Sequence, residues 1–397
     1  MFEHLQIPYR RERWLVGVAD AGLNAAVRSL GWPRTSRAAS PPIPRRILLL
    51  RLERVGDLIM VLEAIALVRA MAPTAVIDLV VGSWNRQLAS LIPGVSTIET
   101  LDVPWLAREG SGMSWGALAA RARAWRSKEY DLAINFEPDI RSNLLLAFSG
   151  APRRVGFASG GGGSLLTDAI APDPRAHIAQ NAKALVAGAF APIAPLAPIA
   201  PLAPLDIPED ARRRAVELVG TSTINAPLVG IQPATGRRVK EWDPARFAEL
   251  GAELARTRGA SVVLIGSTGD KPVLDAVRAA WSSDVTLNEL PPEVDLIDLA
   301  AVLERLSLFI TGDTGPMHLA ALVGTPVLAI FGPSLPTRYA PLSPRSRIVR
   351  IDIHCSPCNL MRQPPARCLG CVPECLAGIP TSDVLRAAEE MLDAALR

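Results

Sequence analysis

Short runs of aliphatic and β-branched residues recur along the chain, and this recurrence restricts the fold more than any other feature. The runs are apolar on both sides and alternate with segments of helical character, which is typical of parallel strands covered by helices. The expected strands are residues 46–51, 75–82, 130–135, 228–232, 261–266, 306–311 and 326–331. The sequence therefore predicts an α/β fold, with helices that include 58–71, 244–258 and 317–323.

A repeat of Ala-Pro-Ile/Leu over residues 191–208 interrupts this alternation once. Such a run favours extended polyproline geometry and is expected to act as a spacer between two domains. A ligand for a proline-binding partner domain is the alternative. Because ligands of parallel sheets bind beyond the carboxyl ends of the strands, a central cleft between the two domains is the expected site. The predicted segments are an N-terminal extension at 1–45, a first domain at 46–190, the linker at 191–208, a second domain at 209–350, a Cys-rich segment at 351–380 and a C-terminal helix at 381–397.

The positive charge of the chain is concentrated in the extension. The 397 residues contain 42 Lys and Arg against 39 Asp and Glu, but residues 1–46 alone hold eight arginines and three acidic residues. A nucleic-acid-binding protein would carry such charge on its folded body, which argues against that class. The hydrophobic share of 49% excludes wholesale disorder.

The extension contains one amphipathic segment, residues 14–32, which is too polar to span a membrane. Its polar residues share one helical face and its apolar residues line another. Two interpretations stay open: a helix lying on an anionic membrane surface, and a helix packed on its own domain. The polar face holds Asp20, Asn24 and Arg28, and the apolar face holds Leu15, Ala19, Leu23, Ala26 and Leu30. No signal peptide pattern follows.

The segment 311–318, Thr-Gly-Asp-Thr-Gly-Pro-Met-His, lies where an expected strand ends and a helix begins. Free amides and the positive end of a helix dipole suit a phosphate there. Asp313 or Thr314 is equally a good helix cap.

The loop 232–242 also follows a strand and concentrates Arg237, Arg238 and Lys240. It suits a diphosphate, although a solvated loop would explain it as well.

Two turns in the first domain each have a functional and a purely structural interpretation. Asp57, after Gly56, could accept a proton from a substrate hydroxyl, or could simply cap a helix. The four glycines at 160–163 could form a phosphate nest, but a mobile loop is the commoner meaning of such a run.

All five cysteines fall within 21 residues, which favours a reducing compartment over a disulfide-stapled secreted protein. Two Cys-x-x-Cys pairs, Cys355 with Cys358 and Cys368 with Cys371, predict a structural zinc site, with Cys375 as an alternate ligand. Free thiols, an iron–sulfur cluster and a redox pair are the alternatives.

In their order along the chain, these motifs resemble glycosyltransferase family 9, the ADP-heptose:lipopolysaccharide heptosyltransferases. The resemblance runs from about residue 46 to the C-terminus, and its most specific segment is Asp-Thr-Gly-Pro-Met-His at 313–318. The matching segments are 51–57, 130–135 with Arg141-Ser142, 154–157, His177 with Asn181, 232–242, 312–320 and 355–358.

The resemblance implies a GT-B fold of two Rossmann-like domains and an inverting sugar transfer that requires no metal. It implies that Asp57 is the catalytic base, with Arg54 and Gly56 on the acceptor side. Lys240 would bind the donor diphosphate. The implied donor contacts are Thr235, Gly236, Lys240, Asp270, Asp313, Thr314, Gly315 and His318. A lysine and helix-start amides can stabilise a departing diphosphate without a divalent ion.

The expected function is transfer of heptose from ADP-heptose to a lipid-linked saccharide of the lipopolysaccharide inner core. The expected place is the inner face of the cytoplasmic membrane, reached through the N-terminal extension. Departures from the family pattern keep other hypotheses open: another nucleotide sugar or acceptor, or a non-catalytic nucleotide-binding protein. The departures are Glu63 for a proline, Gln232 for a histidine, Ala234 for a glycine and Glu241 for a basic residue.

Overall fold

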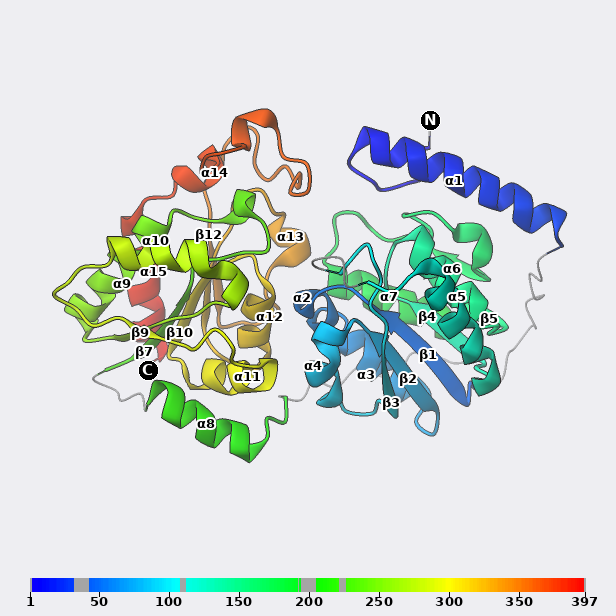
Figure 1. Ribbon diagram of the computed structural model, residues 1–397, viewed down its shortest axis with the longest axis horizontal. Coiled ribbons are helices and arrows are strands. Elements are labelled where there is room, and N and C mark those ends of the chain that lie inside the picture. The colour runs from blue at the N-terminus through cyan, green and yellow to red at the C-terminus, as the bar shows by residue number, and fades with distance from the viewer. Residues whose placement is uncertain are drawn as a thin grey trace. The chain divides into compact units, whose positions relative to one another are not determined.

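The computed structural model describes residues 2–31, 43–107, 112–191, 193, 205–220 and 226–395. The chain forms two compact units, residues 1–203 and 204–397, each with its own sheet (Figure 1). Most of the Ala-Pro repeat, residues 194–204, lies outside the described residues.

The first unit is built on a six-stranded parallel sheet with the order β3-β2-β1-β4-β5-β6. Its central strand is fully buried from Ile47 to Leu50, as a two-sided apolar run requires. The strands are β1 Arg46–Arg51, β2 Val76–Val81, β3 Thr97–Thr100, β4 Leu132–Asn135, β5 Arg153–Phe157 and β6 Asp168–Ile170. The helices are α1 Arg10–Ser29, α2 Val55–Ile59, α3 Leu62–Met71, α4 Arg86–Ser90, α5 Trp115–Ala124, α6 Ile140–Phe148 and α7 Ile178–Phe190, with 3₁₀ turns η1 Ser83–Asn85, η2 Trp125–Lys128 and η3 Gly163–Leu165.

The second unit repeats this plan with the strand order β12-β11-β10-β7-β8-β9, again parallel throughout. The strands are β7 Leu228–Gln232, β8 Ser261–Leu264, β9 Asn288–Glu289, β10 Leu308–Gly312, β11 Val327–Ile330 and β12 Ser346–Val349. The helices are α8 Glu209–Val219, α9 Pro244–Arg258, α10 Lys271–Ala280, α11 Leu296–Arg305, α12 Gly315–Leu322, α13 Pro336–Tyr339, α14 Glu374–Ala377 and α15 Thr381–Ala395, with 3₁₀ turns η4 Arg238–Lys240, η5 Thr268–Asp270 and η6 Ala366–Cys368.

Strand order fixes where each unit can hold a ligand. In the first unit the connections run from β1 to one edge and then return to β4 on the other side of β1. In the second unit the same reversal occurs between β7 and β10. The loops after these strands therefore diverge and leave room beyond the carboxyl ends. The candidate residues are expected at these two points.

Helix α1 belongs to the first unit (Figure 1). It packs on that unit through the face that carries Asp20. Asp20 is buried, and its carboxylate accepts a hydrogen bond from the Gly162 amide at 2.7 Å. Val27 packs with Ala147 and Leu165. The packed face mixes the two predicted faces, because Leu23 packs beside Val27 while Leu15, Leu30 and Arg28 are exposed. A buried carboxylate with a backbone donor decides which face turns inward.

The glycine run at 160–163 is neither a mobile loop nor a nest open to phosphate. Residues 160–162 are buried, and the Asn143 side chain donates to the Gly161 carbonyl at 2.9 Å. The Gly162 amide is already bonded to Asp20. A Cβ at Gly160 would lie 1.7 Å from the Pro138 carbonyl oxygen. Close backbone approach therefore explains Gly160, and φ angles of 89° and 76° explain Gly161 and Gly162.

This packing predicts that Gly160→Ala destabilises the first unit by about 2 kcal/mol or more, because the added Cβ forces two backbone segments apart. Gly22→Ala is the matched control, since a Cβ at Gly22 meets nothing within 4 Å in the middle of α1. Alanine there should stabilise the helix by up to about 1 kcal/mol. Urea unfolding of both variants measures the difference, and equal stabilities would contradict the packed loop.

Candidate active site

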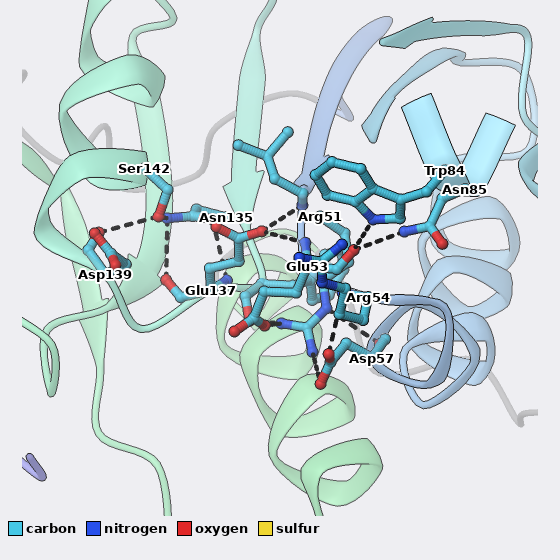
Figure 2. Close-up of polar contacts among 12 residues, drawn as sticks. Arg51, Glu53, Arg54, Asp57, Trp84, Asn85, Asn135, Glu137, Asp139 and Ser142 are labelled. Atoms are coloured by element: carbon cyan, nitrogen blue, oxygen red, sulfur yellow. Dashed lines mark hydrogen bonds and ion pairs between the residues drawn. The ribbon is translucent and has the colours of Figure 1, made fainter. Parts of the chain in front are cut away.

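The turn between β1 and α2 places Asp57 beyond the carboxyl end of the central strand (Figure 2). Its Oδ2 accepts a hydrogen bond from the Arg54 amide at 3.1 Å, so Asp57 does cap the helix start. Its Oδ1 lies 3.5 Å from Nη2 of Arg51, and the side chain is 31% exposed. The carboxylate therefore caps the helix with one oxygen and remains accessible to a substrate hydroxyl.

Arg51 connects this turn to the neighbouring strand. Its buried guanidinium donates to the main-chain carbonyl of Asp57 at 3.1 Å and to that of Phe136, after β4, at 2.9 Å. The same group pairs with the Glu53 carboxylate at 2.7 Å. One side chain thus ties together the ends of β1 and β4 and the first turn of α2.

Glu137 is a buried titratable side chain next to the turn (Figure 2). Its carboxylate accepts hydrogen bonds from the amides of Leu52 and Glu53, which fixes the backbone that leads to Asp57. Burial raises the pKa of Glu137 from 4.5 to about 7, against the opposing effect of Arg51. Burial also raises the pKa of Glu53, and the charge of Asp57 adds to that rise.

The 3₁₀ turn after β2 supports the same loop from the other side. The Trp84 indole and the Asn85 amide both donate to the Glu53 carbonyl, at 2.8 and 2.7 Å. The Arg54 guanidinium lies over the Trp84 ring at 4.6 Å and also donates to the Leu106 carbonyl. Gly56, the other residue predicted on the acceptor side, is buried within α2. Arg54 is therefore held beside the Asp57 turn.

Four residues of this site are not predicted from the sequence, Glu53, Trp84, Asn85 and Glu137, and Arg51 has no predicted role. One sequence signal could have pointed to this site: a polar residue ends each of two buried apolar strands. These residues are Arg51 in β1 and Asn135 in β4. The Asn135 side chain donates to Ser142 and Asn143 at 2.9 and 2.8 Å, and accepts from the Glu137 amide. No local pattern marks Glu137.

In the second unit, the carboxyl ends of β7 and β10 bring the predicted donor residues together. Lys240 donates through Nζ to the Asp313 carbonyl at 2.7 Å and to its carboxylate at 3.1 Å. Both side chains are mostly buried, at 15% and 12% exposure. Thr314 caps α12 by accepting from the Met317 amide at 3.2 Å. Gly312 permits close approach, since a Cβ there would lie 3.0 Å from the Thr235 methyl.

The remaining predicted donor residues surround this group less closely. Gly236 lies on an exposed loop, and His318 is buried on α12 beyond Gly315. Asp270 accepts from the Ser267 amide and hydroxyl at 2.8 and 2.7 Å, at the start of η5. Ser334, which the sequence analysis did not identify, donates to the Asp313 carboxylate at 2.5 Å.

Glu241, one of the departures from the family pattern, accepts a hydrogen bond from the Thr235 amide at 3.3 Å. Burial raises the pKa of Glu241, and the charge of Asp270 adds to that rise. The loop near Lys240 therefore holds an acidic side chain where the family pattern has a basic residue.

Four cysteines line one cavity in the second unit: Cys355, Cys358, Cys368 and Cys375. Cys375, the alternate of the sequence prediction, is buried, whereas Cys371 is exposed and outside the cavity lining. Among the described residues, no group of three or more His, Cys, Asp or Glu side chains could hold a metal ion.

Comparison with known proteins identifies the family. Residues 118–367 match the model of glycosyltransferase family 9 (heptosyltransferase). The chain belongs to glycosyltransferase family 9. It is similar to lipopolysaccharide heptosyltransferase 2 of Salmonella typhimurium, with 28% identity over 77% of this chain and 88% of the relative. The family-9 resemblance from sequence is thereby confirmed, and the chain is a glycosyltransferase.

Solved structures agree on the fold of this family-9 chain. The ADP-heptose lipopolysaccharide heptosyltransferase II of E. coli is similar with a TM-score of 0.72, 24% identity and coverage of 89% of this chain and 100% of that one. A family 9 glycosyltransferase of Veillonella parvula is similar with a TM-score of 0.73 and 24% identity. The similarity covers 88% of this chain and 97% of that one. The GT-B prediction, two Rossmann-like units with parallel sheets, is confirmed.

The raised pKa of Glu137 predicts a pH dependence of stability. Between pH 4.5 and about 7 the unfolded chain has released this proton and the folded chain retains it, so the free energy of unfolding falls as pH rises. Glu137→Gln removes that term and should flatten the slope by up to about 1.4 kcal/mol per pH unit. Urea unfolding at several pH values measures the slope, with the exposed Glu217→Gln as control. An unchanged slope would show that Glu137 is ionised in the folded state.

Proposed function

We propose that this transferase moves heptose from ADP-heptose to a lipid-linked saccharide of the lipopolysaccharide inner core, with inversion at the anomeric carbon. The observation that carries the proposal is the Asp57 carboxylate, partly open to solvent at the end of β1 and held by Arg51. Family membership supports the reaction class, and the chain's similarity to lipopolysaccharide heptosyltransferases supports heptose and lipopolysaccharide.

Asp57 is the general base in this mechanism. Its carboxylate takes the proton of an acceptor hydroxyl as that oxygen bonds to the anomeric carbon of the donor, and the bond from that carbon to the diphosphate oxygen breaks on the opposite face. ADP leaves with the electron pair. The contacts of Arg51 and the Arg54 amide hold the carboxylate in one orientation, so little reorganisation is needed in the transition state.

Lys240 and the start of α12 form the proposed diphosphate site. An ammonium group has three donors, and two of those of Lys240 are directed at Asp313, which leaves the third for a phosphate oxygen. The amides at the beginning of α12 and its dipole add positive potential. These groups stabilise the departing diphosphate, so we propose that transfer requires no metal ion.

The exposed face of α1 is the proposed contact with the membrane. Trp14, Leu15 and Leu30 are 55%, 61% and 76% exposed, and Arg10, Arg11 and Arg28 are exposed along the same helix. The acidic Asp20 is buried against the domain. An aromatic and aliphatic stripe flanked by arginines suits an anionic lipid surface. We therefore place the enzyme at the inner face of the cytoplasmic membrane, where its lipid-linked acceptor would be.

None of the described helices is both long and apolar enough to cross a membrane. Association through α1 would thus be peripheral, driven by the area of the stripe and by the arginines.

Two alternatives remain to be tested against this proposal. Gln232 is buried with an amide oxygen that has no hydrogen-bond partner, and it stands at the end of β7 where the family pattern has a histidine. This observation favours a different nucleotide sugar or acceptor as the second candidate. Titration calorimetry with ADP-heptose, other ADP-sugars and UDP-sugars distinguishes the donors. A non-catalytic nucleotide-binding protein would release no ADP in the presence of acceptor.

The catalytic proposal predicts that Asp57→Asn lowers kcat by about 10²–10⁴-fold. The asparagine oxygen can still accept from the Arg54 amide, so the helix cap is kept while the base is lost. The dissociation constant for ADP-heptose should stay within about threefold. Turnover is measured with ADP-heptose and a lipid A–core acceptor.

The matched control is Asp295→Asn, because Asp295 caps α11 through the amides of Ile297 and Asp298 and has no part in the proposed chemistry. Its kcat should equal that of the wild type. Full turnover by Asp57→Asn would remove Asp57 from the mechanism.

The membrane proposal predicts that replacing Trp14 and Leu15 together by serine weakens binding to anionic vesicles by at least about tenfold, because two apolar side chains no longer enter the lipid. Leu342→Ser, at a site 52% exposed in the second unit, is the control. Sedimentation with phosphatidylglycerol vesicles measures binding, and higher salt should weaken the wild type. Equal binding of both variants would leave α1 as a purely structural helix.

A further inference from the structure

Arg51 holds two carboxyl groups, and the proposed transfer uses only one of them (Figure 2). Its Nη1 pairs with Oε2 of Glu53 at 2.7 Å, and its Nη2 lies 3.5 Å from Oδ1 of Asp57. A guanidinium is planar and its donors form a fixed fork, so the two carboxyl groups lie side by side. Their side chains are similarly accessible, at 35% and 31% exposure. Glu53 is therefore open to the same substrate as the proposed base.

The main chain of Glu53 is fixed from two sides. Its amide donates to the Glu137 carboxylate at 3.0 Å, and its carbonyl accepts from the Trp84 indole and the Asn85 side chain. Glu137 and Asn85 are themselves buried. A side chain that binds a substrate must be held close to its working position, which an ordinary surface glutamate does not require. Together with the pair to Arg51, these contacts hold both ends of Glu53.

This position is costly for a carboxyl group. Partial burial raises the pKa of Glu53 from 4.5 to about 8 against the opposing effect of Arg51, and the charge of Asp57 adds to that rise. Arg51 does not require a second carboxyl partner, because the carbonyls of Asp57 and Phe136 already accept from it. An acid placed where its charged form is disfavoured is typical of a functional site.

The ligand that fits this pair of carboxyl groups is a sugar with two neighbouring hydroxyls. A hydroxyl both donates and accepts hydrogen bonds, so it can pair with Glu53 whether or not the carboxyl carries a proton. An ionised phosphate or carboxylate only accepts, and the charge of Asp57 beside it would repel it. Hydroxyls on adjacent carbons of a sugar ring lie side by side, as the two carboxyl groups do. Asp57 can therefore face one hydroxyl while Glu53 faces its neighbour.

We propose that the carboxyl group of Glu53 binds a second hydroxyl of the acceptor sugar, on the carbon next to the one that carries the reacting hydroxyl. This inference rests on the proposed sugar transfer, in which Asp57 takes the proton of the reacting hydroxyl. Glu53 takes no proton from the reacting groups. It orients the acceptor, and it selects for a sugar that has two adjacent free hydroxyls.

Acceptors that lack single hydroxyls test the contact. The product of the parent lipid A–core acceptor, analysed by NMR, identifies the reacting hydroxyl. Analogues are then prepared in which the hydroxyl on either adjacent carbon is replaced by hydrogen. We expect kcat/KM of the wild type to fall about 10–100-fold with one of these deoxy acceptors, because Glu53 then loses its partner. ADP release measures turnover, and a higher KM for the acceptor should account for most of the loss.

Glu53→Ala shows whether Glu53 is the residue that binds this hydroxyl. With the parent acceptor the variant should raise KM about 10–100-fold and keep kcat within about threefold. With the deoxy acceptor it should lose little more, because the contact is already absent. A Glu53 that merely positioned Arg51 would instead lower kcat, and would lower it equally for both acceptors.

Three further variants complete the comparison. Glu53→Gln, whose amide can still donate and accept, should recover most of the activity with the parent acceptor. Glu53→Met keeps the length of the side chain without its hydrogen-bonding groups, and replaces the alanine variant should that one not fold. Glu63→Ala is the matched control, because Glu63 is also 31% exposed and pairs with Lys183 at 2.6 Å, outside the candidate site. Its kinetics should equal those of the wild type with every acceptor.

Two results would overturn the contact: equal kcat/KM of the wild type with the parent and both deoxy acceptors, or an equal loss by the wild type and Glu53→Ala with the same deoxy acceptor. Either result leaves turnover of the parent acceptor, and with it the proposed function, intact. Absence of ADP release with the parent acceptor would instead overturn the sugar transfer and this inference together.

Discussion

The buried guanidinium of Arg51 is the interaction on which the first unit's candidate site depends. A charge at the end of a fully buried strand is costly unless every donor has a partner. Arg51 finds carbonyl partners on α2 and after β4, and carboxylate partners in Glu53 and Asp57. These contacts also determine where Asp57 lies, so the requirement to satisfy one cation positions the proposed base.

The second unit also has a mostly buried charge that needs hydrogen-bond partners, but here the charge is negative. There the Asp313 carboxylate is the mostly buried charge, and Lys240 and Ser334 are the donors that satisfy it. In each unit the group lies where the strand order reverses, beyond the carboxyl ends of central parallel strands. The two units share one fold, and each has a polar group at the same place in that fold. The group of the first unit surrounds the Arg51 cation, and that of the second unit surrounds the Asp313 anion. This division suits an acceptor hydroxyl on one unit and a diphosphate on the other.

The fold could be predicted from sequence because its signals are local, and so could the position of three candidate residues after buried strands. Two-sided apolar runs define parallel strands, and the turns after them carry Asp57, Lys240 and Asp313. Glu137 could not be found in this way, because its partners are amides some 85 residues away at the end of β1. Cys375 was ranked below Cys371 for a similar reason: spacing favours the nearer pair, whereas the fold of α14 brings the farther thiol into the cavity.

The orientation of α1 shows most clearly how a tertiary contact can reverse a pattern. Helical periodicity identifies a polar and an apolar face, but it does not indicate that a backbone amide at Gly162 needs a buried acceptor. Once Asp20 supplies that acceptor, Trp14, Leu15 and Leu30 face outward, while Leu23 packs beside Val27. The Gly161 carbonyl accepts from Asn143, Asn143 accepts from Asn135, and Asn135 accepts from the Glu137 amide. Glu137 in turn holds the amides of Leu52 and Glu53.

This series of hydrogen bonds connects α1 to the backbone that leads to Asp57, entirely within the first unit. Each step is a side-chain amide or carboxylate bonded to the main chain or to another side chain, and the groups are buried, so breaking any one would leave a partner unsatisfied. A helix placed on a membrane through its outer face would therefore keep a fixed relation to the proposed base. If the acceptor is the proposed lipid-linked saccharide, that relation would set the height above the lipid surface at which the acceptor hydroxyl must be presented.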